Sequence, residues 1–215
     1  MTMAKSEPNA ESARKQTART RSREDPEVRR KSLIQATMRS IAKYGFSGTT
    51  VENICAEAQV SRGMINHYFD TKEELLRQSY RELCDEWAFH TQQMVMNTYS
   101  EPEDRLRAFI RVCFGPTLFK PEYLGIWVGY WSVIAKSPDL RRLHRETYKQ
   151  DRDTYQALFE LAGQKRGCEI NARRAAISLI GLIDGLWLEW GLDPKGFSPK
   201  EAEDACLDFL AKTLA

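Results

Sequence analysis

The chain of 215 residues has a formal net charge of +2, with 42% hydrophobic and 29% charged residues, which is ordinary for a soluble globular protein of one or two domains. We find no apolar run long enough to span a bilayer and no signal-peptide core, which argues against a membrane or secreted protein and predicts a cytoplasmic one. The five cysteines are widely spaced, without a CxxC pair, so we expect neither a zinc site nor a disulfide framework. We expect no metal and no cofactor.

Residues 1–24 contain almost no large apolar side chain, which predicts a disordered arm. This arm is basic, with Arg14, Lys15, Arg19, Arg21 and Arg23 among its cations. Such an arm could enter a DNA minor groove or serve only as a solubilising tail. Residues 1–80 together hold 14 Lys and Arg against 10 Asp and Glu, an excess that could attract phosphates or belong to an ordinary solvated surface.

A first helix is predicted to begin after Asp25, which would act as its N-cap, with Pro26 at the first helical position and Glu27 in the first turn. The apolar spacing places one side of this helix in the core: Val28, Leu33, Ile34, Thr37 and Ile41. Gly45 is expected to end the helix.

Residues 49–72 are typical of a helix-turn-helix, with two short helices followed at once by a third. Three helix starts are marked by capping residues: Thr49 with Glu52, Ser61, and Thr71 with Glu74. The middle helix, about residues 62–68, is too short to be stable alone. Its neighbours must therefore hold it in place.

The middle helix exposes polar side chains if Met64, Ile65 and Phe69 face the core. The residues left outside are Ser61, Arg62, Gly63, Asn66 and His67. Arg and Asn side chains can pair bidentately with guanine and adenine edges, and a helix N-terminus suits phosphate. This arrangement favours DNA recognition, although an ordinary helical hairpin with a polar outer face has the same pattern.

Helical spacing continues through the rest of the chain, and we find no convincing strand. A helix over 71–96 would extend roughly 35–40 Å away from the head and is a plausible lever. Further helices are expected at 103–114, 121–136, 138–164, 171–190 and 199–214. We therefore expect an all-α protein with three parts: a disordered basic arm (1–24), a helix-turn-helix DNA-binding domain (25–70) and a helical regulatory and dimerisation domain (71–215).

The helix expected at 171–190 is hydrophobic nearly all round, which predicts burial on both sides. Together with the last helix it could form half of a four-helix dimer interface, and helix-turn-helix proteins commonly read two half-sites as dimers. The residues expected at this interface are Gly181, Gly185, Leu188, Leu207 and Leu210. Alternatively, the helix is the core of a single subunit.

Aromatic residues gather in two segments of the second domain. Those expected to bind a ligand, with one carboxylate among them, are Phe119, Tyr123, Trp127, Tyr130, Trp131, Asp184 and Trp187. Aromatic cages bind quaternary ammonium groups, and Asp184 would add charge complementarity. The alternative is plain core packing, in which Asp184 still needs a partner.

A specific pattern covers about 50 residues of the head: Ile34-x-Ala36, Tyr44-Gly45-Phe46-x-x-Thr49-Thr50-Val51-x-x-Ile54, and Ala58-x-Val60-Ser61-x-Gly63-x-Ile65-x-His67-Tyr68-Phe69-x-x-Lys72-Glu73-Glu74-Leu75. It resembles the Tet-repressor (TetR) family of transcriptional regulators. The resemblance implies a homodimer that binds an operator and releases it when a small molecule enters the C-terminal domain. It places the following residues at or near DNA: Thr50, Ser61, Arg62, Gly63, Asn66, His67, Tyr68 and Lys72.

The second domain carries Arg105-Leu106, Phe119-x-Pro121-Glu122, Trp127-x-x-x-Trp131 and Leu179-Ile180-x-Leu182-Ile183-Asp184-Gly185-Leu186-Trp187-Leu188. These residues resemble the BetI-type branch, whose members control choline uptake and its oxidation to glycine betaine and respond to choline. The resemblance implies a repressor of choline, glycine betaine or related quaternary-ammonium metabolism. The alternative within the family is a regulator of a drug-efflux pump that senses lipophilic cations.

Two further classes of function remain to be weighed. The sequence has no phosphate-binding Gly loop, no HExxH and no nucleophile elbow, so we expect no enzymatic activity. A constitutive architectural DNA binder without a ligand is also possible, and it would be favoured by a second domain that lacks a cavity.

Overall fold

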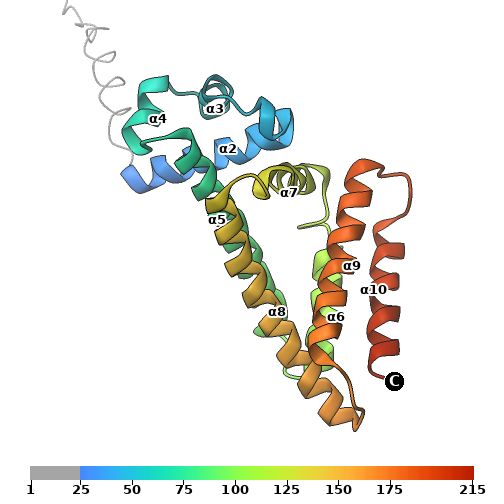
Figure 1. Cartoon of the computed structure of the whole chain (residues 1–215). Helices are drawn as coiled ribbons and strands as arrows, with labels where there is room; N and C mark the ends of the chain where they lie inside the picture. The colour runs from blue at the N-terminus through green and yellow to red at the C-terminus, as the bar shows by residue number, and fades with distance from the viewer. Residues whose placement is uncertain (1–24) are drawn as a thin grey trace, which may run out of the picture.

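The computed structural model describes residues 25–215, which form helices without any strand (Figure 1). The elements are α2 (Pro26–Gly48), α3 (Val51–Ala58), α4 (Arg62–Tyr68), α5 (Lys72–Thr91), the π-helical turn η1 (Gln92–Met96), α6 (Pro102–Cys113), α7 (Pro121–Ile134), α8 (Pro138–Arg166), α9 (Ala172–Leu192) and α10 (Pro199–Thr213). The prediction of an all-α fold is confirmed. The arm predicted at 1–24 lies outside the described residues.

Helices α2, α3 and α4 form a head at one end of the molecule (Figure 1). Helix α5 leaves the head and runs beside α8, while α6, α9 and α10 form the opposite side. Helix α7 lies directly beneath the head, where it packs on α2. The head and the rest of the protein therefore meet through two helices, α5 and α7.

Most helix boundaries follow the sequence pattern closely. Helix α5 and η1 together reach Met96, where the long helix was predicted to end. Helix α10 begins with a complete capping box, because the Ser198 hydroxyl accepts from the Glu201 backbone N–H and the Glu201 carboxylate accepts from that of Ser198. These boundaries are local features, set by side chains within one turn of each other.

The cap of α3 differs from the prediction by one residue. Thr50, not Thr49, is the N-cap, and its hydroxyl accepts from the Asn53 backbone N–H at 3.2 Å. Thr49 is buried and donates to the Gly45 carbonyl at 2.8 Å. Gly45 has a φ of +70°, where the regular part of α2 ends. The Thr49 hydroxyl is thus used to close that helix end instead of opening the next one.

One other prediction in the head is wrong, and a second is confirmed only in position. Val28 was placed on the buried face of the first helix, but it is 55% exposed, because the buried residues of α2 begin only at Leu33. Ser61 occupies the N-cap position of α4, yet its hydroxyl caps no backbone group. The first turn closes instead through the Ser61 carbonyl, which accepts from the Met64 N–H at 3.0 Å.

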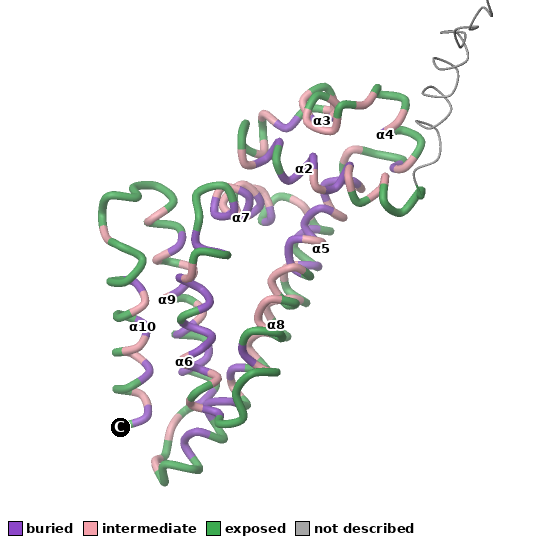
Figure 2. Tube along the Cα trace, turned by 180° about the vertical axis from the view of Figure 1, so that it is seen from behind, coloured by how far each residue is buried: buried purple, intermediate pink, exposed green. Residues whose placement is uncertain are grey.

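Helix α9 is long and apolar enough to cross a membrane by length and composition, contrary to the expectation from the sequence. Here it packs along α8, α10 and α7. Its outer face stays at the surface, where Ile177, Leu188 and Leu192 are exposed. The predicted burial on both sides is therefore absent within a single chain. Figure 2 shows the same kind of asymmetry on the neighbouring helix α10, along which buried and exposed positions alternate.

Candidate functional site

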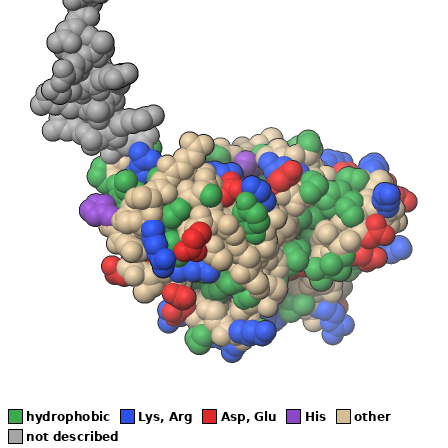
Figure 3. All heavy atoms as spheres, turned by 90° about the horizontal axis from the view of Figure 1, so that it is seen from above, with side chains coloured by type: hydrophobic (Ala, Val, Ile, Leu, Met, Phe, Trp, Pro, Cys, Tyr) green, Lys and Arg blue, Asp and Glu red, His purple; other side chains and the backbone are tan. Residues whose placement is uncertain are grey.

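Helix α4 exposes its polar side at the tip of the head. Ile65 and Phe69 are buried at 2% exposure and fix its inner side. The predicted DNA-contacting residues are exposed in most cases, namely Thr50, Ser61, Arg62, Gly63, Asn66 and His67, while Tyr68 and Lys72 are half-buried. Viewed from above the head, Lys and Arg side chains are interspersed with acidic ones, without one wide basic field (Figure 3). Contact with DNA would therefore depend on individual side chains.

Arg30 of α2 holds the end of α4 in place. Its guanidinium donates to the Tyr68 carbonyl at 2.7 Å and to the Gln78 side chain at 2.7 Å. The same group lies over the Phe69 ring, 4.5 Å from its centroid. Arg30 thus ties α2, α4 and α5 together, and gives a short helix the support that it lacks by itself.

Arg62 at the start of α4 forms an ion pair with Glu52 of α3, with 3.2 Å between nitrogen and oxygen. Both side chains are about two-thirds exposed. Exposed ion pairs contribute about 0–1 kcal/mol. The guanidinium can therefore leave Glu52 for a stronger acceptor at little cost.

Gly129 of α7 allows the close packing of this helix on α2. A Cβ at Gly129 would lie 2.7 Å from the Ile41 side chain, whereas a Cβ at Gly125 would make ordinary contacts of 3.7 Å with the Ala42 backbone. The opposite side of α7 carries the aromatic residues of the second domain. Helix α7 therefore connects the head directly to the aromatic cluster.

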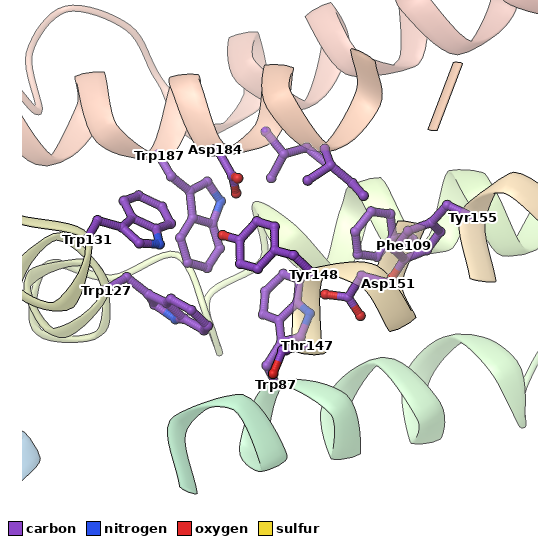
Figure 4. Close-up of a pocket in the computed structure, with 12 residues that line it drawn as sticks. Trp87, Phe109, Trp127, Trp131, Thr147, Tyr148, Asp151, Tyr155, Asp184 and Trp187 are labelled. Atoms are coloured by element: carbon purple, nitrogen blue, oxygen red, sulfur yellow. The ribbon is translucent and has the colours of Figure 1, made fainter. Parts of the chain in front are cut away.

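The second domain encloses a small cavity of about 30 Å³ lined by five helices (Figure 4). Its lining is mostly aromatic: Trp87, Phe109, Trp127, Trp131, Thr147, Tyr148, Asp151, Tyr155, Ile180, Ile183, Asp184 and Trp187. Such a volume holds about one or two water molecules. A larger molecule can enter only if the lining helices move apart.

The indole rings around the cavity meet edge to face. The Trp87 ring lies 5.6 Å from that of Trp187 and 6.3 Å from that of Trp127, with interplanar angles of 85° and 79°. Phe109 and Tyr155 stack at 4.0 Å farther along the cavity. Ring faces carry negative electrostatic potential and attract cations.

Two carboxyl groups, Asp151 on α8 and Asp184 on α9, line the same cavity. Burial raises the pKa of Asp151 to about 6, and the Trp87 indole hydrogen-bonds to its carboxyl group. Burial also raises the pKa of Asp184 to about 7, with the negative charge of Asp151 adding to the rise and the Tyr148 hydroxyl opposing it through a hydrogen bond. Each carboxyl group has a hydrogen-bonding neighbour, but we find no cationic side chain lining this cavity.

Three polar groups beside the cavity lack hydrogen-bond partners among the residues that the structure describes: the indole nitrogens of Trp127 and Trp187 and the hydroxyl of Tyr123. Trp127 and Trp187 are each 4% exposed, so solvent does not reach them freely. The Trp127 indole lies near the Tyr123 hydroxyl, yet neither has a partner within hydrogen-bond distance. Buried polar groups are paired in the large majority of cases.

The predicted ligand residues divide into two sets. Trp127, Trp131, Asp184 and Trp187 line the cavity. The other predicted residues do not, and they take different positions: Phe119 packs against Trp187 and Trp190, Tyr123 packs against Trp127 and Trp187, and Tyr130 donates its hydroxyl to the Leu76 carbonyl at 2.9 Å. Tyr130 is fully buried between α7 and α5 and does not line the cavity, so its role as a ligand residue stays a prediction that this cavity does not support.

Sequence reasoning missed eight residues that line the cavity: Trp87, Phe109, Thr147, Tyr148, Asp151, Tyr155, Ile180 and Ile183. Trp87 lies within the helix predicted over 71–96, where helical spacing alone gives no sign of a ligand site. Asp151 lies in a strongly charged stretch of α8, where nothing in the sequence distinguishes an inward carboxylate from an exposed one. The available signal was the Tyr148, Asp151, Tyr155 spacing of three and four residues, which puts these side chains on one side of a helix.

An outer groove of about 530 Å³ adjoins the cavity and shares Trp131, Tyr148 and Asp184 with it. Gly185 and Leu188, on the exposed side of α9, also line this groove. The cavity therefore approaches the surface next to the apolar side of α9.

The residues predicted at a dimer interface are placed unequally. Gly181 and Gly185 face open space and Leu188 is exposed. Leu207 is half-buried, and Leu210 is fully buried. Leu210 is buried within its own chain, where α10 packs on α6 and α9, so its role at a dimer interface stays a prediction that this packing does not support.

The described residues hold no cluster of three His, Cys, Asp or Glu side chains able to bind a metal ion. The five cysteines are free, and three of them, Cys84, Cys113 and Cys206, are buried. Burial raises the pKa of the Cys84 and Cys206 thiols to about 12. These cysteines are unreactive packing residues.

Comparison with known proteins matches both parts of the chain. Residues 33–78 match the family model for bacterial regulatory proteins of the tetR family, and residues 102–215 match that for the BetI-type transcriptional repressor C-terminal domain. The HTH-type transcriptional regulator BetI of Burkholderia mallei (strain NCTC 10229) is 35% identical over 190 residues, which cover 88% of this chain and 95% of that protein. The BetI of Paraburkholderia phymatum is also 35% identical, covering 88% and 94%.

Solved structures share the fold. A transcriptional regulator from Pseudomonas aeruginosa PAO1 superposes with a TM-score of 0.79 at 32% identity, covering 89% of this chain and 92% of that one. A transcriptional regulator from Saccharomonospora viridis, solved in complex with choline, has a TM-score of 0.77 at 22% identity, covering 85% and 95%.

Proposed function

The chain belongs to the TetR family and carries a BetI-type repressor C-terminal domain, and we propose that it represses genes of choline, glycine betaine or related quaternary-ammonium metabolism. In this proposal the head holds an operator until a small quaternary ammonium ion, choline in the first place, enters the aromatic cavity. The proposal rests mainly on one observation. Asp151 and Asp184 line the same cavity as four tryptophans, Trp87, Trp127, Trp131 and Trp187.

A quaternary ammonium ion fits the chemistry of this cavity. Such an ion cannot donate hydrogen bonds, so a protein binds it through aromatic faces and nearby negative charge. The cavity offers both, with Trp87 and Tyr155 beside Asp151 and Trp187 beside Asp184. The related fold from Saccharomonospora viridis is a complex with choline, which supports the same class of ligand for this chain.

TetR-family regulators bind operator DNA, and the exposed side of α4 is the surface proposed for this contact. Arg62 and Asn66 are placed to read base edges, with a smaller share for His67. Tyr68 and Lys72, at the end of α4 and the start of α5, are assigned to phosphates. A cytoplasmic location follows from this role.

Regulators of this family dimerise, and the exposed apolar side of α9 is the surface proposed for a second copy of the chain. Gly181 and Gly185 would allow the two α9 helices to approach closely, with Leu188 and the half-buried Leu207 beside them. Two heads related by a two-fold axis would then read two half-sites of one operator.

Release of the operator follows from the size of the cavity. A trimethylammonium group is larger than the available 30 Å³, so it favours a state in which the lining helices stand farther apart. Trp87 belongs to α5 and Trp127 to α7, and these are the two helices that meet the head. A ligand can shift the balance between two states only by binding one of them better.

The proposal is tested by titrating the full chain with choline in calorimetry and in an operator gel shift. Choline should bind to the protein and cause it to release the operator. A bulky lipophilic dye cation should neither bind nor cause release. If the dye binds and choline does not, the protein is instead a sensor for efflux, the alternative function within the family. If neither choline nor betaine aldehyde shifts melting or releases the operator, the choline proposal fails.

The assigned phosphate contacts are tested separately with Lys72→Ala and Tyr68→Phe. Each should weaken operator binding at all sequences, and Lys72→Ala should lower the slope of affinity against salt concentration by about 1. Lys31→Ala is the matched control, because Lys31 is an exposed cation of the head that pairs with Glu82. Unchanged gel shifts across a salt series would remove Tyr68 and Lys72 from the DNA surface.

A further inference from the structure

We propose that the indole N–H of Trp187 determines which cations the cavity accepts, by donating a hydrogen bond to an uncharged oxygen on the ligand. The cavity would thus select an ammonium ion that carries a hydroxyl group over one that carries only alkyl groups. This inference rests on the proposed function, since it concerns the ligand of the same site.

The first support is the unpaired state of this donor. Trp187 is 4% exposed, and its indole nitrogen has no hydrogen-bond partner in the described residues. A buried N–H without a partner carries the full cost of its lost hydration. Packing alone does not require this residue to be a tryptophan, because a phenylalanine would supply an aromatic ring without the unpaired donor.

The second support separates Trp187 from the other indoles of the cavity. The Trp87 indole lies near the Asp151 carboxyl group, and the Trp127 indole lies near the Tyr123 hydroxyl. Trp87 and Trp187 meet edge to face at 5.6 Å. The hydrogen bond to the ligand is therefore assigned to Trp187.

The third support is the placement of the donor (Figure 4). The nitrogen of Trp187 is on the side of its ring where Asp184 and the Tyr148 hydroxyl are drawn, and Asp151 lies farther along the cavity. All four residues line the same enclosed space. A cation directed at Asp151 would therefore bring an attached oxygen toward Trp187 and Asp184.

The nearby carboxyl group restricts the kind of oxygen. A hydroxyl can accept from the Trp187 N–H and donate to the Asp184 carboxylate at the same time. A carboxylate on the ligand would be repelled by the negative charge of Asp184, and the low dielectric constant of the site strengthens this repulsion. The site should therefore prefer an alcohol to the corresponding acid, and choline to glycine betaine.

The experiment compares three cations by calorimetry on the full chain at one pH: choline, propyltrimethylammonium, in which a methyl group replaces the hydroxyl, and glycine betaine. We expect choline to bind about tenfold more tightly than propyltrimethylammonium, the effect of one hydrogen bond. In Trp187→Phe this ratio should fall to about one, although both affinities fall. Glycine betaine should be the weakest ligand.

Trp87→Phe is the matched control, because it removes a neighbouring indole that lies near the Asp151 carboxyl group. This variant should retain the preference for choline over propyltrimethylammonium. Equal binding of the two cations by the unaltered protein, or a preference that survives in Trp187→Phe, overturns the inference and leaves the proposed function intact. Binding of none of the three cations refutes the proposed function itself. The comparison of choline with propyltrimethylammonium on the unaltered protein requires no variant. It therefore tests the inference even if Trp187→Phe fails to fold.

Discussion

The head and the cavity are built in opposite ways. The residues assigned to DNA lie within 23 consecutive positions, from Thr50 to Lys72, and most of them point outward. The cavity takes its lining from five helices, between Trp87 and Trp187, and its side chains point inward. Each surface is therefore sensitive to a different kind of change.

The DNA-contacting surface of the head comes from one short stretch of chain, so distant substitutions should change it little. The cavity depends instead on how whole helices pack. The two regions still communicate, because α5 and α7 belong to both. Some substitutions should affect one region alone, and others should affect the contact between α7 and α2 that joins the two regions. These two kinds of substitution should differ in their effects on operator binding, ligand binding and stability.

The largest expected effect is confined to the cavity. Asp184→Asn should weaken choline binding about a hundredfold or more, because a buried charge loses its partner. Operator binding without choline should be unchanged. The variant should be at least as stable as the parent at pH 7.5, since it removes a carboxylate whose pKa burial has raised to about 7. Calorimetry, gel shift and thermal melting measure the three quantities.

Glu189→Gln is the control for Asp184→Asn, since it removes an exposed carboxylate from the same helix. It should leave choline affinity within a factor of two. A comparable loss in both variants would mean that the charge of α9 as a whole attracts the cation, and the cavity would lose its assigned role.

A second substitution acts on the contact between α7 and α2. Gly129→Ala should lower the free energy of unfolding by about 1–3 kcal/mol, because its Cβ would lie 2.7 Å from Ile41 and force α7 away from α2. It should also change the choline concentration needed to release the operator. Gly125→Ala is the matched control one turn away, where a Cβ meets only ordinary contacts at 3.7 Å. Equal effects at both positions would refute the special role of Gly129.

The pH dependence should separate ligand binding from stability. Burial raises the pKa of Asp184 to about 7 and that of Asp151 to about 6, and only the deprotonated groups attract a cation. Choline affinity should therefore fall about tenfold from pH 8 to pH 6. The other titratable or charged groups that act on the two carboxyl groups are Tyr148 and Arg152, and His144 and Arg141 line the outer groove beside Asp184.

Stability should follow the opposite trend. A carboxyl group whose pKa is raised in the folded protein keeps its proton while the unfolded chain loses it, so these two groups lower the stability as pH rises from about 4 to about 7. Melting without ligand, followed over this range, measures the trend in the parent protein and in Asp184→Asn. A parent protein whose choline affinity is independent of pH would contradict the charge assignment.

The smallest expected effect is confined to the head. Thr50→Ala removes the N-cap of α3 and should lower the free energy of unfolding by about 1 kcal/mol. Choline affinity should stay the same, because α3 contributes nothing to the cavity. Ser47→Ala, at an exposed position nearby, is the control and should be near neutral. A change in choline affinity after Thr50→Ala would show that the head is less independent than its local construction implies.

The sequence by itself determined the helices, most of their ends and the outward side of α4. These features depend on side chains three or four positions apart, so a single stretch of chain contains the whole signal. Even the error at Thr49 was small, because the correct cap is the next residue.

Only the tertiary structure decided which aromatic residues share a cavity. Helical periodicity shows that Trp87, Tyr130 and Trp187 belong on apolar sides, but it does not say which helix each side meets. Tyr130 was therefore expected in the cavity, from which it lies apart, and Asp151 was missed although it lines the same small space as Asp184. The same reason explains Leu210, whose apolar side turned inward onto its own subunit, while Leu188 on the neighbouring helix remained at the surface.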